Sequence, residues 1–410
     1  MASTNRCSGQ KLTILHVTPI YEPAWNAGGV VRTVSILCRS LARLGHKVDV
    51  VTTDSDGTAC MEVDRCGDVQ VGGVRVRYVH TQMPRRFRYA RGMNDVLRER
   101  VEHADIVHLA SFWNHAGALT TKLCEKLGVP CVISTHGTFL PEAMANGRLR
   151  KWVYLKLFDE KTLKNAAAYH YTTDLERRKM DGFRPKRPSF LIPNGLDLSE
   201  LAPVPNREES RKHFGLDNDD FVVGFLGRLH EIKALDVLIS GVDRAVRAGL
   251  SHIEVLLAGP DGGAEDQLKK LVVTKNLSNH VRFLGPVHGE IKKRFLAALD
   301  VVSLVSWTEN FGNAAAEAMA MGVPALVSEN VGLCDIVQQD GGGVVIPVDE
   351  HAVASALEQL AGDVESRRMM GQAAKAIAWT RFEADAVASL MAKAYADVLT
   401  GKRSPECNWQ

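Results

Sequence analysis

The chain from residue 307 to residue 328, WTENFGNAAAEAMAMGVPALVS, predicts a loop, a short helix and a strand in succession. The alanine-rich part, from about Asn313 to Met321, is expected to be the helix, and it should end at Gly322, because glycine is common just beyond a helix. Glu317 follows Glu309 by eight positions. Glu309 is therefore expected on the loop, and Glu317 in the first turns of the helix.

Unpaired backbone N–H groups are expected at the start of this helix, around residues 311–314, where they favour a bound anion such as phosphate. The two glutamates flank these amides, so their carboxylates can accept hydrogen bonds from sugar hydroxyls. A nucleotide-sugar, with a diphosphate between two groups of hydroxyls, fits this pattern. The alternative for Glu317 is an ordinary solvated charge, but the alanines and methionines around it favour a closely packed helix.

The stretch resembles the E-x7-E signature of family-4 retaining glycosyltransferases, which have the GT-B fold. The match includes Phe311, Gly312, Glu317, Ala318 and Pro324. The resemblance implies that Glu317 holds the ribose hydroxyls and that Glu309 holds the hydroxyls of the sugar ring. It also implies that the donor is bound by Asn310, Phe311, Gly312 and Asn313.

At 410 residues the chain is too long for one ordinary core, and its alternation of apolar strands and helices predicts an α/β protein with two Rossmann-like domains. A stretch rich in Pro and Asn near residues 192–206 predicts the boundary between domains 1–197 and 198–380. The resemblance implies that the two domains face each other across a cleft, with the donor in the second. It also implies that residues 381–410 form a helix that returns to the first domain.

In the first half, the strand expected at residues 12–18 leads into a loop that contains Gly28 and Gly29. The two glycines either make a tight turn or let the backbone approach a ligand, and the loop is not G-x-G-x-x-G. In the resembling family this loop lies over the donor phosphates. His136 follows another strand, expected at 129–134, and a family histidine at this place meets the donor sugar. His108 and His115 remain open as acceptor-side residues.

In the second half, Arg228 and Lys233 lie five positions apart at a strand-helix junction, where both cations can reach one diphosphate. The alternative is a pair of surface charges. The string resembles the family's Gly-Arg-Leu…Lys element, although Ala234 stands where the family usually has glycine. Leu284 falls where family members contact the nucleotide base. The segment ENVGLCDIV, residues 329–337, departs from the commoner family string, which makes the base and sugar preference less predictable.

The net charge of +2 divides unevenly along the chain. Residues 1–200 carry 29 Lys and Arg against 20 Asp and Glu, whereas residues 201–410 carry 21 against 28. A basic half indicates an anionic partner. Arginines and aromatics also alternate in residues 85–91 and 148–158, which is typical of contact with an anionic membrane, of nucleic-acid binding, or of plain solvated helices. No nucleic-acid motif accompanies these stretches, so we expect no nucleic-acid partner.

Asp54 and Asp56 form a D-x-D pair, which binds a metal in some other glycosyltransferases. Here the pair follows a predicted strand and is better explained as a turn with local hydrogen bonds, so we expect no metal and no cofactor. The eight cysteines show no C-x-x-C pair and are expected to be free thiols. The polar start of the chain and the lack of long apolar runs predict a cytoplasmic protein, which could work at the inner face of the membrane.

The sequence therefore indicates a retaining hexosyltransferase that moves a sugar from a UDP- or GDP-sugar to a hydroxyl acceptor, which could be lipid-linked, in glycan, polysaccharide or glycolipid assembly. Its catalytic residues are expected to be His136, Arg228, Lys233 and Glu309. A GT-B-fold epimerase, a phosphorylase and a non-catalytic module that binds anionic glycan or lipid are the alternatives. No residue stands out as a nucleophile, so same-face attack is expected from the resemblance.

Overall fold

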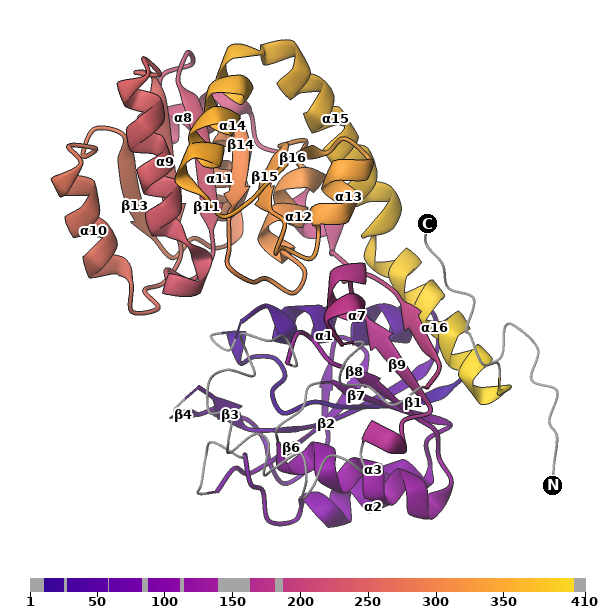
Figure 1. The fold of residues 1–410 in the computed structure, drawn as a ribbon. Coiled ribbons are helices and arrows are strands. Elements are labelled where there is room, and N and C mark those ends of the chain that lie inside the picture. Colours follow the sequence, from indigo (N-terminus) through magenta and orange to yellow (C-terminus); the bar gives the residue numbers. More distant parts are fainter. Residues whose placement is uncertain are drawn as a thin grey trace. The chain divides into compact units, whose positions relative to one another are not determined.

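The computed structural model describes residues 11–25, 28–57, 59–82, 88–110, 114–138, 163–180 and 187–401. They form two compact units (Figure 1). Unit 1 contains the residues up to Gly195 and those from Ala384 onward, and unit 2 runs from Leu196 to Glu383. The sequence placed the same divisions after residues 197 and 380, within three residues of those observed.

Unit 1 is built on an eight-stranded sheet in the order β10-β9-β8-β7-β1-β2-β6-β5. All neighbours are parallel except β5 and β6. The strands are β1 (Thr13–Val17), β2 (Lys47–Thr53), β5 (Val69–Val71), β6 (Val74–Val79), β7 (Ile106–Ala110), β8 (Cys131–Ser134), β9 (Ala168–Tyr171) and β10 (Ser189–Leu191). Most of them are buried on both faces, which explains why the sequence shows continuous apolar runs.

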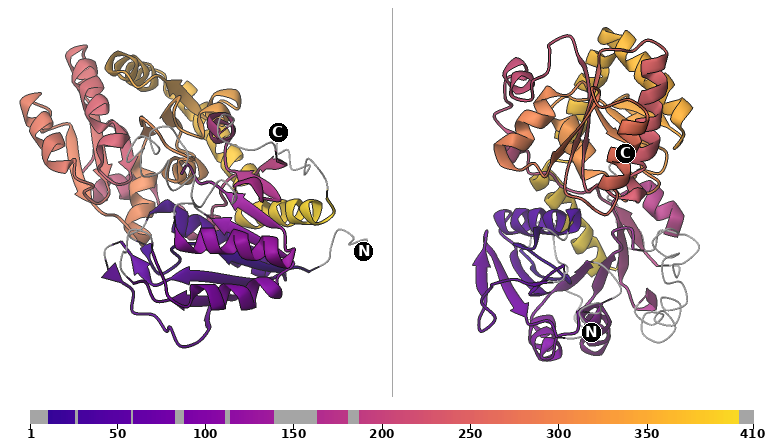
Figure 2. Two further views of the ribbon diagram at one scale, coloured as in Figure 1. Left: turned by 60° about the horizontal axis from the view of Figure 1, so that its bottom comes forward. Right: turned by 90° about the vertical axis from the view of Figure 1, so that its left-hand side faces the viewer.

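Helices cover both faces of this sheet (Figure 2). Along β1, Ile14 packs in the core with α1 (Gly29–Arg43) and α16 (Ala384–Leu399), whereas Leu15 packs in the core with α2 (Met93–Glu102) and α3 (His115–Leu127). This alternation follows from the two-residue period of a strand. A small antiparallel pair, β3 (Ser55–Asp56) and β4 (Ala59–Cys60), follows β2.

The last helix, α16, belongs to unit 1 and lies beside α1 (Figure 1). Arg43 of α1 pairs with Asp385 of α16, with 2.6 Å between Nη2 and Oδ1. Tyr395 is fully buried, and its hydroxyl lies 2.5 Å from Nδ1 of His108 on β7. The chain therefore returns to the first unit to complete it, as the fold class predicted.

Unit 2 has a six-stranded parallel sheet in the order β13-β12-β11-β14-β15-β16. Its strands are β11 (Phe221–Leu226), β12 (Ile253–Ala258), β13 (Val281–Gly285), β14 (Val301–Leu304), β15 (Ala325–Ser328) and β16 (Gly343–Ile346). Its helices are η4 (Leu198–Leu201), α8 (Arg207–His213), η5 (Glu231–Lys233), α9 (Leu235–Arg247), α10 (Glu265–Thr274), α11 (Gly289–Ala298), α12 (Asn313–Ala320), α13 (Cys334–Gln339), α14 (Glu350–Gly362) and α15 (Val364–Arg381).

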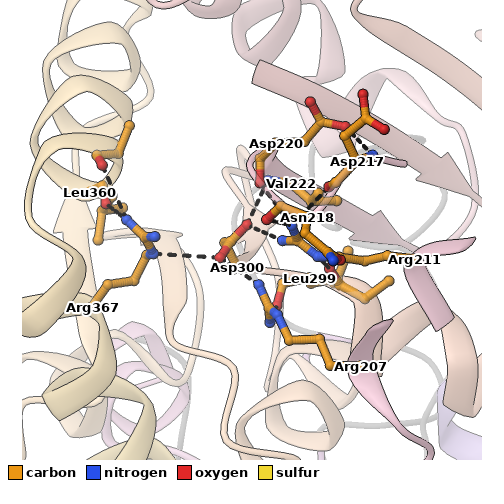
Figure 3. Close-up of polar contacts among 12 residues, drawn as sticks. Arg207, Arg211, Asp217, Asn218, Asp220, Val222, Leu299, Asp300, Leu360 and Arg367 are labelled. Atoms are coloured by element: carbon orange, nitrogen blue, oxygen red, sulfur yellow. Dashed lines mark hydrogen bonds and ion pairs between the residues drawn. The ribbon is translucent and has the colours of Figure 1, made fainter. Parts of the chain in front are cut away.

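A buried carboxylate, that of Asp300, lies at the end of this sheet where the central strands β11 and β14 begin (Figure 3). Asp300 accepts hydrogen bonds from Nη2 of Arg207 and Nη2 of Arg211, both at 2.6 Å, and from the N–H of Val222 at 2.8 Å. Arg367 of α15 lies 3.6 Å away from the same carboxylate. These bonds tie two strands to helices α8 and α15, and they leave the opposite strand ends to carry the site described next.

Candidate functional site

The loop that carries Lys233 is fixed by the loop after the neighbouring strand. Helix η5 follows β11, and the carbonyl oxygen of Ile232 accepts hydrogen bonds from the N–H of Trp307 at 3.0 Å and from Oγ of Ser306 at 2.8 Å. β11 and β14 are neighbours in the sheet. Their carboxyl ends therefore present their loops together, at the edge where open α/β sheets bind ligands.

These loops bring Lys233 and Glu309 into contact. Nζ of Lys233 donates to Oε2 of Glu309, and both side chains are partly buried. The backbone of Glu309 is held on both sides, because its N–H donates to Asn330 and its carbonyl oxygen accepts from Gly332 at 2.9 Å. The segment that departs from the family string thus fixes the first glutamate. Sequence analysis assigned separate roles to Lys233 and Glu309 and did not predict that they would pair.

The start of α12 is open, as the sequence predicted. Gly312 is its N-cap, with a φ of 105°, a backbone conformation that favours glycine, and no side chain caps the helix. The neighbouring Asn313 is partly exposed. The ring of Phe311 is instead buried against Phe382, with 5.4 Å between ring centroids. Only the backbone of Phe311 can face a ligand, because its side chain belongs to the core.

Glu317 is not a solvated surface charge. Its side chain is 8% exposed, and its Oε2 lies 2.6 Å from Nζ of Lys292, which is 14% exposed. Lys292 stands in the first turn of α11, which follows the end of β13. The sequence analysis did not single out this lysine. It lies beside Lys293 and Arg294 in a basic run that gave no signal of an inward-facing cation.

Two further predicted donor residues lie at the same strand ends of unit 2. Arg228 lies two positions past β11 and is exposed, and Leu284 lies near the end of β13 and is half-buried. Ala234, which follows Lys233, has a φ of 47° in the left-handed region. This conformation explains why glycine is usual there, and alanine keeps it at a cost of about 1–2 kcal/mol.

In unit 1, two turns carry the predicted site residues. Gly28 has a φ of 100° and precedes α1, whose first residue is Gly29, and no side chain caps this helix either. His136 lies past the end of β8, with a φ of 44°, rare for a residue other than glycine. Both turns lie at the carboxyl ends of parallel strands of one sheet.

The turn at His136 is held by a buried glutamate that the sequence analysis missed. Glu176, in helix α7 (Asp174–Met180), is 2% exposed. Its carboxylate accepts hydrogen bonds from the N–H of Gly137 at 2.7 Å, the N–H of Thr172 at 2.9 Å and the hydroxyl of Thr135. In the sequence DLERRKM this residue looks like one charge of a solvated helix, and only the folded chain shows its partners.

A row of histidines crosses the sheet of unit 1 on the face covered by α1 and α16. His16, His108 and His170 stand on β1, β7 and β9, and Ser134 of β8 lies between the last two. Nε2 of His170 lies 2.8 Å from the carbonyl oxygen of Ile192, so it must donate. Nδ1 of His170 then accepts from Ser134, which accepts from His108, whose Nδ1 accepts from Tyr395.

These directions hold for neutral histidines, and burial keeps both rings neutral. Desolvation lowers the pKa of His170 to about 4 and the pKa of His108 well below its ordinary value. The pKa of His16 falls to about 3, because His16 is also buried and lies near His170 and His136. Neither of its ring nitrogens has a hydrogen-bond partner. Desolvation likewise lowers the pKa of His136, at the edge of the row, to about 4.

Asp54 does not form the expected turn with local side-chain bonds. One of its oxygens accepts from the N–H of Thr81 at 2.8 Å, and the other lies 2.7 Å from Nδ1 of His80 and 2.8 Å from Nε of Arg65. With Cys60, Asp54 and His80 form the one group of possible metal ligands among the described residues. Arg65 already neutralises this carboxylate, and the expectation of no metal stays a prediction.

Comparison with known proteins identifies the family. The family described as "Glycosyltransferase Family 4" matches residues 27–200, and "Glycosyl transferases group 1" matches residues 206–377. A D-inositol 3-phosphate glycosyltransferase from Kineococcus radiotolerans is 30% identical over 403 residues, which cover 89% of this chain and 90% of the relative. The chain belongs to glycosyltransferase family 4. The predicted family, and an enzyme that transfers a sugar, are confirmed.

Solved structures confirm the GT-B fold of this glycosyltransferase. HepE from Anabaena, in complex with UDP-glucose, has a TM-score of 0.73 at 19% identity, covering 94% of this chain and 100% of HepE. Sucrose-phosphate synthase from Thermosynechococcus elongatus has a TM-score of 0.71 at 21% identity, covering 95% of this chain and 100% of the synthase. At these identities the likeness establishes the fold, and the roles of single residues stay predictions.

Two predicted features concern a membrane. The arginine-rich stretch at 148–158 lies outside the described residues, and of the stretch at 85–91 only residues 88–91 can be placed. Within the described ranges of this glycosyltransferase, no helix has the length and apolar character that a membrane span requires.

Proposed function

We propose that this glycosyltransferase moves a hexose-type sugar from a nucleoside-diphosphate-sugar, with UDP or GDP as the leaving group, to a hydroxyl acceptor, and that it retains the configuration at the anomeric carbon. It needs no metal in this scheme. The sugar transfer serves the assembly of a glycan, polysaccharide or glycolipid.

The contact between Lys233 and Glu309, beside the uncapped start of α12, carries this proposal. A cation and the backbone amides of an uncapped helix start lie within one loop cluster, together with a carboxylate that can accept from hydroxyls. The cation and the amides suit a diphosphate, whereas the carboxylate suits the sugar attached to it. Arg228, exposed at the same strand ends, adds a second cation with a flexible reach.

In the reaction, negative charge grows on the leaving diphosphate as its bond to the sugar breaks. Lys233, Arg228 and the amides at the start of α12 stabilise this charge, which is often the largest contribution to catalysis. When Lys233 pairs with the diphosphate, it releases Glu309, whose carboxylate can then accept hydrogen bonds from the hydroxyls of the sugar ring. His136 would contact the sugar near the reacting carbon. No described residue is assigned as a nucleophile, so the acceptor attacks on the face that the leaving group occupies, with the leaving phosphate as base.

The similar proteins support a nucleotide-sugar donor and reduce the range of candidate acceptors. HepE has been solved with UDP and with UDP-glucose. Two relatives are named D-inositol 3-phosphate glycosyltransferase, and the acceptor in that name is a phosphorylated polyol. Together with the basic first half of this chain, these names favour an acceptor that carries phosphate, either soluble or lipid-linked. Peripheral contact with an anionic membrane fits the lipid-linked case.

The test measures nucleotide release from UDP- and GDP-sugars, with soluble polyol phosphates and lipid phosphates as acceptors and with EDTA present. An epimerase turns over the donor without any acceptor, and a binding module releases no nucleotide. The anomeric configuration of the product, read by NMR, decides retention. Inversion of an α-donor to a β-product would disprove the retaining mechanism.

Two variants test the assigned residues. Lys233→Ala and Glu317→Ala should each raise the activation free energy by about 1.5–3 kcal/mol, as expected for a lost hydrogen bond to a charged group. This corresponds to a loss of about 10- to 150-fold in kcat/KM for the donor. Lys275→Ala is a matched control, because Lys275 is also a partly buried lysine in an ion pair, 3.1 Å from Asp243. If the two site variants behave like this control, the assignment is wrong.

A further inference from the structure

Lys292 and Glu317 form an ion pair that is almost entirely removed from water. The 2.6 Å contact joins the first turn of α11 to α12, and the two side chains are 14% and 8% exposed. Both helices begin at the carboxyl ends of strands, α11 after β13 and α12 after β14, and these are the ends that carry the proposed donor site. Lys292 is therefore a cation at this site, on the helix that follows the strand expected to contact the nucleotide base.

Stability alone is a poor reason for such a pair. Removing two charges from water costs free energy that their attraction often does no more than offset, so an apolar pair of the same size would hold the helices together as well. The pair does fix the orientation of the glutamate, because the side chain cannot rotate without leaving the ammonium. Lys292 occupies one acceptor position of this carboxylate, on Oε2.

We propose that Lys292 is a positioning residue for nucleotide recognition: it holds the carboxylate of Glu317 in the orientation in which this carboxylate accepts hydrogen bonds from the ribose hydroxyls of the donor. The inference rests on the proposed function and deepens it. Lys292 touches no part of the ligand and acts through Glu317. Affinity for the ribose then depends on α11 as well as on α12.

The chain contains a matched control in the next residue. Nζ of Lys293 lies 2.8 Å from Glu290 of the same helix, and its side chain is 16% exposed, close to the 14% of Lys292. The two lysines differ in the glutamate that they hold, since Glu290 is largely exposed and belongs to α11 itself. Lys293→Met removes a lysine and an ion pair from the same turn and leaves Glu317 with its partner.

The experiment measures by calorimetry the affinity of the full chain for UDP and for 2′,3′-dideoxy-UDP, or for the corresponding guanosine compounds if the wild type prefers GDP. Lys292→Met should weaken UDP binding by about tenfold, a typical loss for a charge-assisted hydrogen bond. It should change binding of the dideoxy compound by less than about twofold, because that ligand has no ribose hydroxyls for Glu317 to hold. Lys293→Met should change neither.

A variant pair keeps the test decisive if Lys292→Met does not fold. Glu317→Gln combined with Lys292→Met removes both charges of the pair, and its UDP affinity should match that of Glu317→Gln alone within about twofold. A further tenfold loss would mean that Lys292 contacts the nucleotide directly, and it would overturn the inference. So would an equal loss for UDP and dideoxy-UDP. A wild type that binds neither UDP nor GDP would instead refute the proposed donor.

Discussion

Mild acid should unfold unit 1 before unit 2, because unit 1 buries a row of neutral histidines. The pKa of His16 is lowered to about 3 and that of His170 to about 4, while that of His108 lies well below its ordinary value. In the unfolded chain each recovers an ordinary pKa of 6.5. Below that pH the unfolded state binds more protons than the folded state. The free energy of unfolding is therefore not reduced by these histidines above pH 6.5, and it falls as the pH drops toward 4.

The size of the effect follows from the pKa shifts. At pH 5 the solution lies about 1.5 units below the unfolded pKa and above the folded values, and each unit corresponds to about 1.36 kcal/mol. His16 and His170, whose folded pKa values are about 3 and about 4, therefore each lower the free energy of unfolding by about 2 kcal/mol, and together they lower it by about 4 kcal/mol. A typical domain is stable by only 5–15 kcal/mol. Protonation of His108 would bury a positive charge beside Tyr395, so α16 should loosen first.

Hydrogen exchange followed by mass spectrometry, between pH 5 and pH 7.5, reads both units of the full chain at once. Exchange is corrected for its intrinsic pH dependence, and peptides from β11 and β12 then serve as an internal reference for peptides from β1 and β7. His16→Leu should reduce the loss in the free energy of unfolding of unit 1 at pH 5 by about 2 kcal/mol. It should not destabilise unit 1 at pH 7.5, because the ring nitrogens of His16 have no hydrogen-bond partners. The exposed His103, replaced by Gln, is the control.

The explanation fails if both units lose protection in parallel, or if His16→Leu keeps the full pH dependence of the wild type. The first result would assign acid sensitivity to the carboxylates of the whole chain. The second would mean that His16 is protonated in the folded state, contrary to its burial.

Two further substitutions test the packing of unit 2 and the turn that carries His136. Gly371→Ala should destabilise unit 2 by about 1–3 kcal/mol in thermal unfolding, because its new methyl would lie 2.3 Å from the carbonyl oxygen of Gly322; Gly362→Ala, with no atom within 4 Å, should not destabilise the fold. Glu176→Gln should lower kcat/KM by about tenfold while exchange in unit 2 stays unchanged, since one carboxylate oxygen of Glu176 holds the turn that carries His136. Full activity in this variant would show that the turn needs no carboxylate.

The strands and the family were accessible from the sequence for a clear physical reason. Parallel strands buried on both faces leave continuous apolar runs, and the strands predicted at 12–18 and 129–134 are observed as β1 and β8, with bounds that differ by at most two residues. The helix around Glu317 was recognisable because glycines mark its two ends. Such signals are local, and a single sequence contains all of them.

The partners of the site residues were not accessible, because each lies far away in the chain. Lys233 and Glu309 are 76 positions apart, and Glu176 holds a turn about 40 positions before it. Nothing in the run of Lys292, Lys293 and Arg294 reveals which cation faces inward, since neighbouring residues on a helix face different directions. The folded chain settles these points through the register of its sheets and the packing of its helices.

The return of α16 to the first unit has a consequence for biosynthesis. Unit 2 is one continuous segment, residues 196–383, so it can reach its final form as soon as the ribosome has released it. The earlier unit must wait until residues 384–399 have emerged as well, because α16 covers part of one face of its sheet. The N-terminal unit is therefore finished last, and a premature stop codon shortly before residue 384 would leave a complete second unit joined to a first unit that exposes its core.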